Sequence, residues 1–119
     1  MEDAPNILSK SVILLALARL DQKLAAQGII GELCIFGGAA MILAFDARES
    51  TRDVDGIFVP KQKFAELANE TGAELDLPEG WLNDGVKGFL SPYGELTGEE
   101  MPQFDHLRVL RPTLSLIHI

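Results

Sequence analysis

Two short groups of residues in this sequence have the types and the spacing to do chemistry: Gly37-Gly38, and the carboxylates Asp53 and Asp55. Glycines let a backbone approach a ligand closely, because no Cβ stands in the way. A helix that follows them offers unpaired N–H groups and the positive end of its dipole, which together favour a phosphate. Side chains at positions i and i+2 of a strand share a face, so we expect Asp53 and Asp55 to converge.

The two carboxylates also indicate a metal ion. Carboxylates this close repel each other unless a cation lies between them. Mg²⁺ suits such a pair, because it takes oxygen ligands and completes its shell with water and substrate phosphates. Taken singly, Gly37-Gly38 could be a simple turn and the Asp pair a solvated strand end. Together they predict a phosphate site beside a metal site.

The elements before the Asp pair are expected to position it. Residues 7–27 read as an amphipathic helix, because four apolar residues recur at steps of four, three and four. These residues are Ile13, Leu17, Leu20 and Leu24. Residues 31–36 suit a buried strand, which Gly37-Gly38 ends, and residues 39–45 suit a helix that is apolar nearly all round.

The chain then returns through a polar turn at residues 46–52 to a second strand at residues 53–59, which Pro60 stops. The first Asp follows the second Gly by fifteen residues. That interval holds one helix and one turn, the length of chain needed to reach a neighbouring strand. Residues 61–71 suit an exposed helix, with an inward face formed by Phe64, Leu67 and Ala68.

The last third of the sequence is less regular. Residues 77–89 predict a further helical segment with Trp81 on its buried face, and residues 91–103 predict a loop rich in Gly and Pro. Residues 107–110 alternate enough to be a third strand. The order of helix, strand, helix, strand, helix and strand predicts an α/β (α+β) fold with a mixed sheet flanked by helices.

The stretch from Phe36 to Met41, together with that from Arg48 to Asp55, resembles the signature of the DNA polymerase β-type nucleotidyltransferase superfamily. The family pattern is a hydrophobic strand, Gly-Gly or Gly-Ser, a helix with Ala and Leu, and then Arg-x-Thr-x-Asp-φ-Asp, where φ is aliphatic. This chain has one more residue between Arg48 and Thr51 than the commonest form. It is most similar to bacterial nucleotidyltransferase-like proteins that include the abortive-infection toxins of toxin–antitoxin pairs.

The resemblance implies a nucleotidyltransferase-like fold and a reaction. Gly37 and Gly38 would hold the triphosphate of an NTP, and Asp53 and Asp55 would bind Mg²⁺. A nucleotidyl group would move to a hydroxyl of RNA or protein, and a cognate antitoxin would be a partner. Thr51 or Arg52 would touch phosphate, although turn capping by Thr51 and a solvated charge at Arg52 remain the alternative.

Active members of the family carry a third carboxylate on a later strand, as general base and metal ligand. The best candidate is Asp105, directly before the strand at residues 107–110, although capping of the strand start or of a turn is the favoured alternative for this residue. Glu99 and Glu100 in the preceding loop are weaker candidates. Two other hypotheses stay open: a nucleotide-binding module without turnover, and a structural domain whose Gly-Gly and Asp pairs are fortuitous.

Composition limits the partners. The chain has 119 residues, enough for one small domain, and a net charge of −8, which disfavours a long nucleic-acid groove. Cys34 stands alone in an apolar run, so we expect a buried thiol and no internal disulfide. The apolar run at residues 12–18 is too short to span a membrane, and no signal peptide is visible, so we expect a cytoplasmic protein.

The last six residues, from Leu114 to Ile119, fit nothing before them. One codon spelling of this hexapeptide is the transposon end sequence used to fragment DNA for sequencing. We therefore expect residues 114–119 to be a non-native, adapter-encoded tail, and residues 1–113 to be the N-terminal part of one domain that continues. The alternative is a genuine apolar C-terminal strand.

Overall fold

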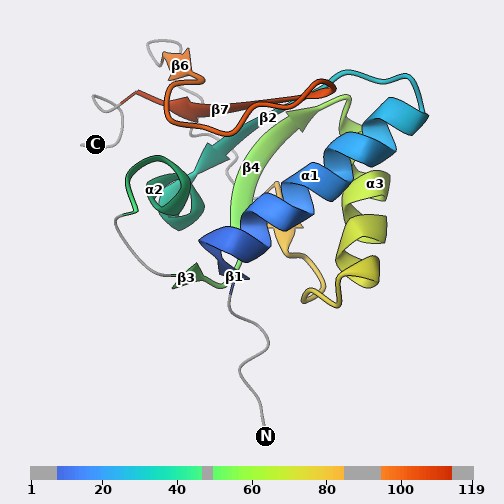
Figure 1. Cartoon of the computed structure of the whole chain (residues 1–119), viewed down its shortest axis with the longest axis horizontal. Helices are drawn as coiled ribbons and strands as arrows, with labels where there is room; N and C mark the ends of the chain where they lie inside the picture. Colours follow the sequence, from blue (N-terminus) through green and yellow to red (C-terminus); the bar gives the residue numbers. More distant parts are fainter. Residues whose placement is uncertain (1–7, 47–49, 85–94, 114–119) are drawn as a thin grey trace, which may run out of the picture.

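The computed structural model describes residues 8–46, 50–84 and 95–113 (Figure 1). These residues form three helices and a mixed sheet. In chain order the elements are β1 (Leu8–Ser9), α1 (Lys10–Ala26), β2 (Gly31–Phe36), α2 (Gly37–Phe45), β3 (Ser50–Thr51), β4 (Val54–Val59), α3 (Lys61–Glu74), β5 (Leu82–Asn83), β6 (Leu96–Thr97) and β7 (Leu107–Pro112). The predicted mixed α+β architecture is confirmed. Residues 114–119, for which the sequence predicts a non-native tail, lie outside the described residues.

The main sheet has the strand order β5-β4-β2-β7-β6, so β2 is its central strand. β2 pairs antiparallel with β4 and parallel with β7, while β5 runs parallel to β4 and β6 antiparallel to β7. Phe36 at the end of β2 lies opposite Asp55 near the start of β4. A second pairing joins Leu8 to Thr51, which ties the start of α1 to the turn before β4.

The apolar stripe predicted for α1 is its buried face, since Ile13, Leu17, Leu20 and Leu24 have no exposed surface. The hydroxyl of Ser9 caps the helix by accepting a hydrogen bond from the backbone N–H of Val12 at 3.3 Å. α1 and α3 lie side by side over the sheet in Figure 1. Leu24 of α1 and Phe64 of α3 both approach Gly31 so closely that a Cβ there would touch them. The small residue lets two helices pack on the central strand.

Every second residue of the central strands points toward α1 and α3. Leu33, Ile35, Val54, Leu107 and Val109 are all fully buried. Residues of the other parity on β2, β4 and β7 include Glu32, Asp55 and Arg108, which keep part of their surface exposed. Cys34 is buried, as expected. The carboxylate at position 55 therefore lies on the face of the sheet turned away from α1 and α3.

The helix predicted over residues 77–89 is wrong for its described part. Residues 77–81 form no helix and include a turn at residues 79–80, Leu82–Asn83 forms β5, and residues 85–89 lie outside the described residues. Gly80 adopts a φ of 76°, which a helix cannot accommodate. Trp81 is buried as predicted, but from a turn and not from a helix face. None of the described helices is long and apolar enough to cross a bilayer.

Candidate functional site

The antiparallel pairing of β2 and β4 brings Gly37 to the Asp pair. Gly37 follows Phe36, whose partner across the ladder is Asp55. Its φ of 66° lies in the left-handed region, where glycine is favoured. A Cβ built on Gly37 would lie 3.7 Å from Oδ2 of Asp55. The first residue of α2 and the Asp55 carboxylate are therefore neighbours, and Gly38 continues the first turn of the helix.

Asp53 and Asp55 flank Val54 at the start of β4, so their side chains lie on the same side of the strand, the side turned away from α1 and α3. Both side chains are partly exposed. Burial raises the pKa of the Asp53 carboxyl above its usual value, and the nearby charge of Asp55 raises this pKa further. The charge of Asp55 thus adds to burial in opposing the ionisation of Asp53.

Asn83 is a member of this site that the sequence reasoning missed. β5 places it level with Asp55 on the neighbouring parallel strand. Its Nδ2 donates a hydrogen bond to Oδ2 of Asp53 at 3.2 Å, which opposes the rise in the pKa of that carboxyl. No pattern marked Asn83, because it lies thirty residues after Asp53 and inside a segment predicted to be helical.

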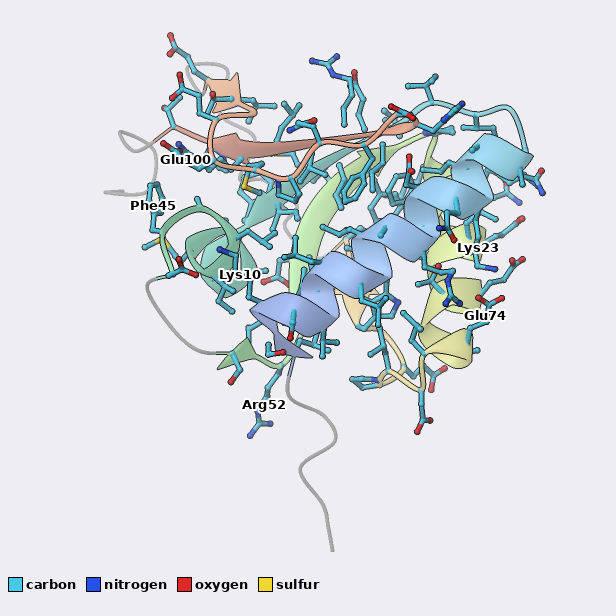
Figure 2. All side chains as sticks on the ribbon, in the orientation of Figure 1. Lys10, Lys23, Phe45, Arg52, Glu74 and Glu100 are labelled. Atoms are coloured by element: carbon cyan, nitrogen blue, oxygen red, sulfur yellow. The ribbon has the colours of Figure 1, made fainter. Side chains whose placement is uncertain are left out.

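Thr51 and Arg52 directly precede Asp53 in the chain, and their side chains are placed differently. The hydroxyl of Thr51 donates to the backbone carbonyl of Asp53 at 3.3 Å, the turn contact that was the alternative to phosphate binding. Arg52 is exposed, and its side chain points away from the body of the protein (Figure 2). Arg52 directly precedes Asp53 in the chain, and its guanidinium is not buried in the core.

Asp105 is not brought to the pair. Leu107 lies beside Gly31 in the parallel pairing of β7 with β2, whereas the pair lies beside Phe36. The two levels are five residue steps apart on β2, about 17 Å at the rise of a strand. The assignment of Asp105 as third carboxylate of the same site is therefore not supported, because β7 enters the sheet at the opposite end.

Glu99 and Glu100 are engaged by a buried cation, Arg111. The Nε of Arg111 donates to the carbonyl of Glu99 at 3.0 Å, and its Nη2 donates to the Glu100 carboxylate. The Arg111 guanidinium also lies 4.9 Å from the ring centre of Phe45 on α2. Phe45 and Glu100 mark this region in Figure 2. Arg111 thus fastens the loop after β6 to the end of α2, a structural role that fits its exposed fraction of only 3%.

The donor set can be compared with what Mg²⁺ needs. Within residues 8–46, 50–84 and 95–113, no three or more His, Cys, Asp or Glu side chains are grouped to hold a metal. Mg²⁺ is commonly held by one or two carboxylates, with the remaining positions filled by water and substrate phosphates. Asp53 and Asp55 supply two partly exposed carboxylates, which is the number that such a site commonly uses.

A scan against protein-family models finds no matching family, and searches of curated proteins and of solved structures find no match.

Proposed function

We propose that this chain is a metal-dependent nucleotidyltransferase whose site is the edge formed by Gly37, Asp53 and Asp55. The observation that carries the proposal is the register of β2 with β4, which places the start of α2 beside the Asp55 carboxylate. A nucleotidyltransferase-like fold and a bacterial toxin-like role, with a cognate antitoxin as partner, are part of the same proposal. They rest on the resemblance of the Gly-Gly and Asp-x-Asp segments.

The residues would divide the work between phosphate and metal. The exposed backbone of Gly37 and the positive end of α2 would bind the triphosphate of an NTP. Asp53 and Asp55 would hold Mg²⁺, which supplies charge neutralisation to the phosphates when bound. A hydroxyl oxygen of the acceptor would bond to the α-phosphorus as the bond to pyrophosphate breaks, and the hydroxyl proton would leave to water.

The net charge of the chain limits which acceptor it can bind. A net charge of −8 opposes the binding of a long nucleic-acid backbone. Arg52 is the cation nearest to the pair along the chain, and it is exposed. An RNA end or a hydroxyl on a protein therefore suits this surface better than a duplex does.

The test is transfer of label from α-labelled NTPs to RNA or protein acceptors by the full gene product, with pyrophosphate release measured in parallel. Asp53→Ala and Asp55→Ala should each abolish Mg²⁺-dependent transfer. Asp105→Ala is the matched control, since it removes a carboxylate at the opposite end of β2 and should keep activity. Equal transfer by all three variants would refute the proposal.

The second candidate is a nucleotide-binding module without turnover. It is favoured by the position of Asp105, which leaves the pair without the predicted third carboxylate among the residues that the structure describes. This function predicts Mg²⁺-dependent binding of an NTP, lost in Asp53→Ala, with no release of pyrophosphate. Equilibrium binding and pyrophosphate assays on the same sample separate the two functions.

A further inference from the structure

The side chain of Asn83 donates a hydrogen bond to a carboxylate of the candidate site. Its Nδ2 lies 3.2 Å from Oδ2 of Asp53, although its partner in the ladder is Asp55. The amide therefore reaches diagonally across the strand pair to the carboxylate that precedes β4. A hydrogen bond to one oxygen restricts the rotation of a carboxylate group about its last side-chain torsion.

The position of Asn83 is itself enforced by the residues before it. The backbone carbonyl of Trp81 accepts a hydrogen bond from the N–H of Val54 at 2.6 Å, which begins the pairing of β5 with β4. The indole Nε1 of Trp81 donates to the carbonyl of Ala68 in α3 at 2.9 Å. Gly72 makes room for this ring, because a Cβ there would lie 2.7 Å from Cδ1 of Trp81.

An amide is chemically suited to this place. It donates to a carboxylate without adding negative charge to a site that already holds Asp53 and Asp55. A third carboxylate here would increase the repulsion between the acids, and an aliphatic side chain would leave Asp53 without this donor. Outer-shell groups that orient metal-binding carboxylates act in this way in other metal sites.

We propose that Asn83 is a positioning residue of the site, holding the Asp53 carboxylate in the orientation in which Asp53 and Asp55 bind a divalent cation together. The inference rests on the proposed function, which assigns the cation to this pair. It adds that a residue of β5, anchored to α3 through Trp81, determines how tightly the cation binds.

The test uses Mn²⁺ alone, titrated into the full gene product while the free ion is followed by electron paramagnetic resonance. Asn83→Leu removes the donor at nearly constant volume and should weaken Mn²⁺ binding by about 10- to 100-fold. Asn83→Ala should show the same loss and serves if the leucine variant does not fold. Asp84→Asn is the matched control: it changes the next residue, whose carboxylate pairs with Lys61 at 2.8 Å, and should bind Mn²⁺ like the wild type.

The outcomes separate this inference from the proposed function. Wild-type affinity in a folded Asn83 variant overturns the positioning role while the cation site stands. An equal loss in Asp84→Asn also overturns it, because loosening of β5 would then explain the effect. If the wild type binds Mn²⁺ no more tightly than Asp53→Ala does, the cation site is refuted, and both the proposed function and this inference fall.

Discussion

The charged groups between α1 and α3 and the carboxylate pair at the start of β4 are arranged in opposite ways. Glu74 of α3 accepts hydrogen bonds from Lys23 at 2.6 Å and from Arg19 at 3.0 Å, and Figure 2 shows Lys23 and Glu74 near each other. The hydrogen bonds from Lys23 and then Arg19 lower the pKa of the Glu74 carboxyl. Burial and the charge of Asp55 instead raise the pKa of Asp53.

The difference separates charges that favour the folded state from charges that oppose it. Opposite charges between two helices help to hold them together, although each exposed pair contributes little. Like charges on one short strand cost free energy in folding, and such an arrangement is typical of a site that binds something. The contrast supports placing the candidate function at the pair and not at the helices.

The largest expected effect is on transfer activity. Asp53→Asn keeps the size of the side chain but removes its charge, and it should lower Mg²⁺-dependent transfer by more than about 100-fold, because the proposed site would lose a metal ligand. Glu74→Gln makes the same chemical change between the helices and should leave the rate unchanged. Initial rates at saturating NTP measure both. A similar fall in the transfer rate of both variants would show that the two regions do not differ in function.

Trp81 connects the two regions, and its removal should have the largest effect on stability. Trp81→Ala deletes a buried ring and its hydrogen bond to Ala68, so we expect a loss of about 3 kcal/mol or more in the free energy of unfolding. Urea denaturation followed by circular dichroism measures this loss. A change below about 1 kcal/mol would mean that α3 and β5 are not joined through this side chain.

Gly37→Ala should cost about 1 kcal/mol, because an alanine resists the left-handed backbone. Gly28→Ala is a matched control: Gly28 has a φ of 68°, and a Cβ there would meet nothing within 4 Å. Both variants should lose similar stability, but only Gly37→Ala should also weaken NTP binding. Thermal melts and equilibrium binding test this pair of outcomes, and unchanged NTP binding in Gly37→Ala would exclude a close approach of ligand to α2.

The smallest effects are on how stability depends on pH, and they have opposite signs. Because the folded state raises the pKa of Asp53 above 3.8, stability is lost as pH rises from that value through the folded pKa. Asp53→Asn should therefore be more stable than the wild type near neutrality, by a few tenths of a kcal/mol after screening by solvent.

Glu74 behaves in the reverse sense. Its folded pKa lies below 4.5, so its stabilisation is present above that value and is lost as pH falls through the folded pKa. Glu74→Gln should be less stable than the wild type near neutrality and equal to it in acid. Urea denaturation of both variants at about pH 3 and about pH 7 measures the two trends. Trends of the same sign would contradict the comparison.

Much of the fold follows from local pattern. The stripe of α1, the apolar run of β2 and the strand after Asp53 are periodic enough to identify from the sequence, and their observed bounds differ by a few residues. The helix predicted after α3 is wrong. The apolar residues of this segment suggest a helix, but Pro78, Gly80 and the hydrogen bonds of Trp81 favour a turn that leads into β5. A side-chain hydrogen bond to a helix elsewhere in the chain, such as that of Trp81 to Ala68, produces no periodic pattern in the local sequence.

The sequence by itself determined which side chains could do chemistry, since the spacing of Gly37, Asp53 and Asp55 requires only one helix and one return strand. Only the tertiary structure decided which residues stand beside them. The register of β5 with β4 places Asn83 beside the carboxylate pair, and the start of β7 at the opposite end of β2 keeps Asp105 away from it. Strand order and register depend on packing between residues far apart in the chain, and a spacing pattern read along one segment contains no record of that packing.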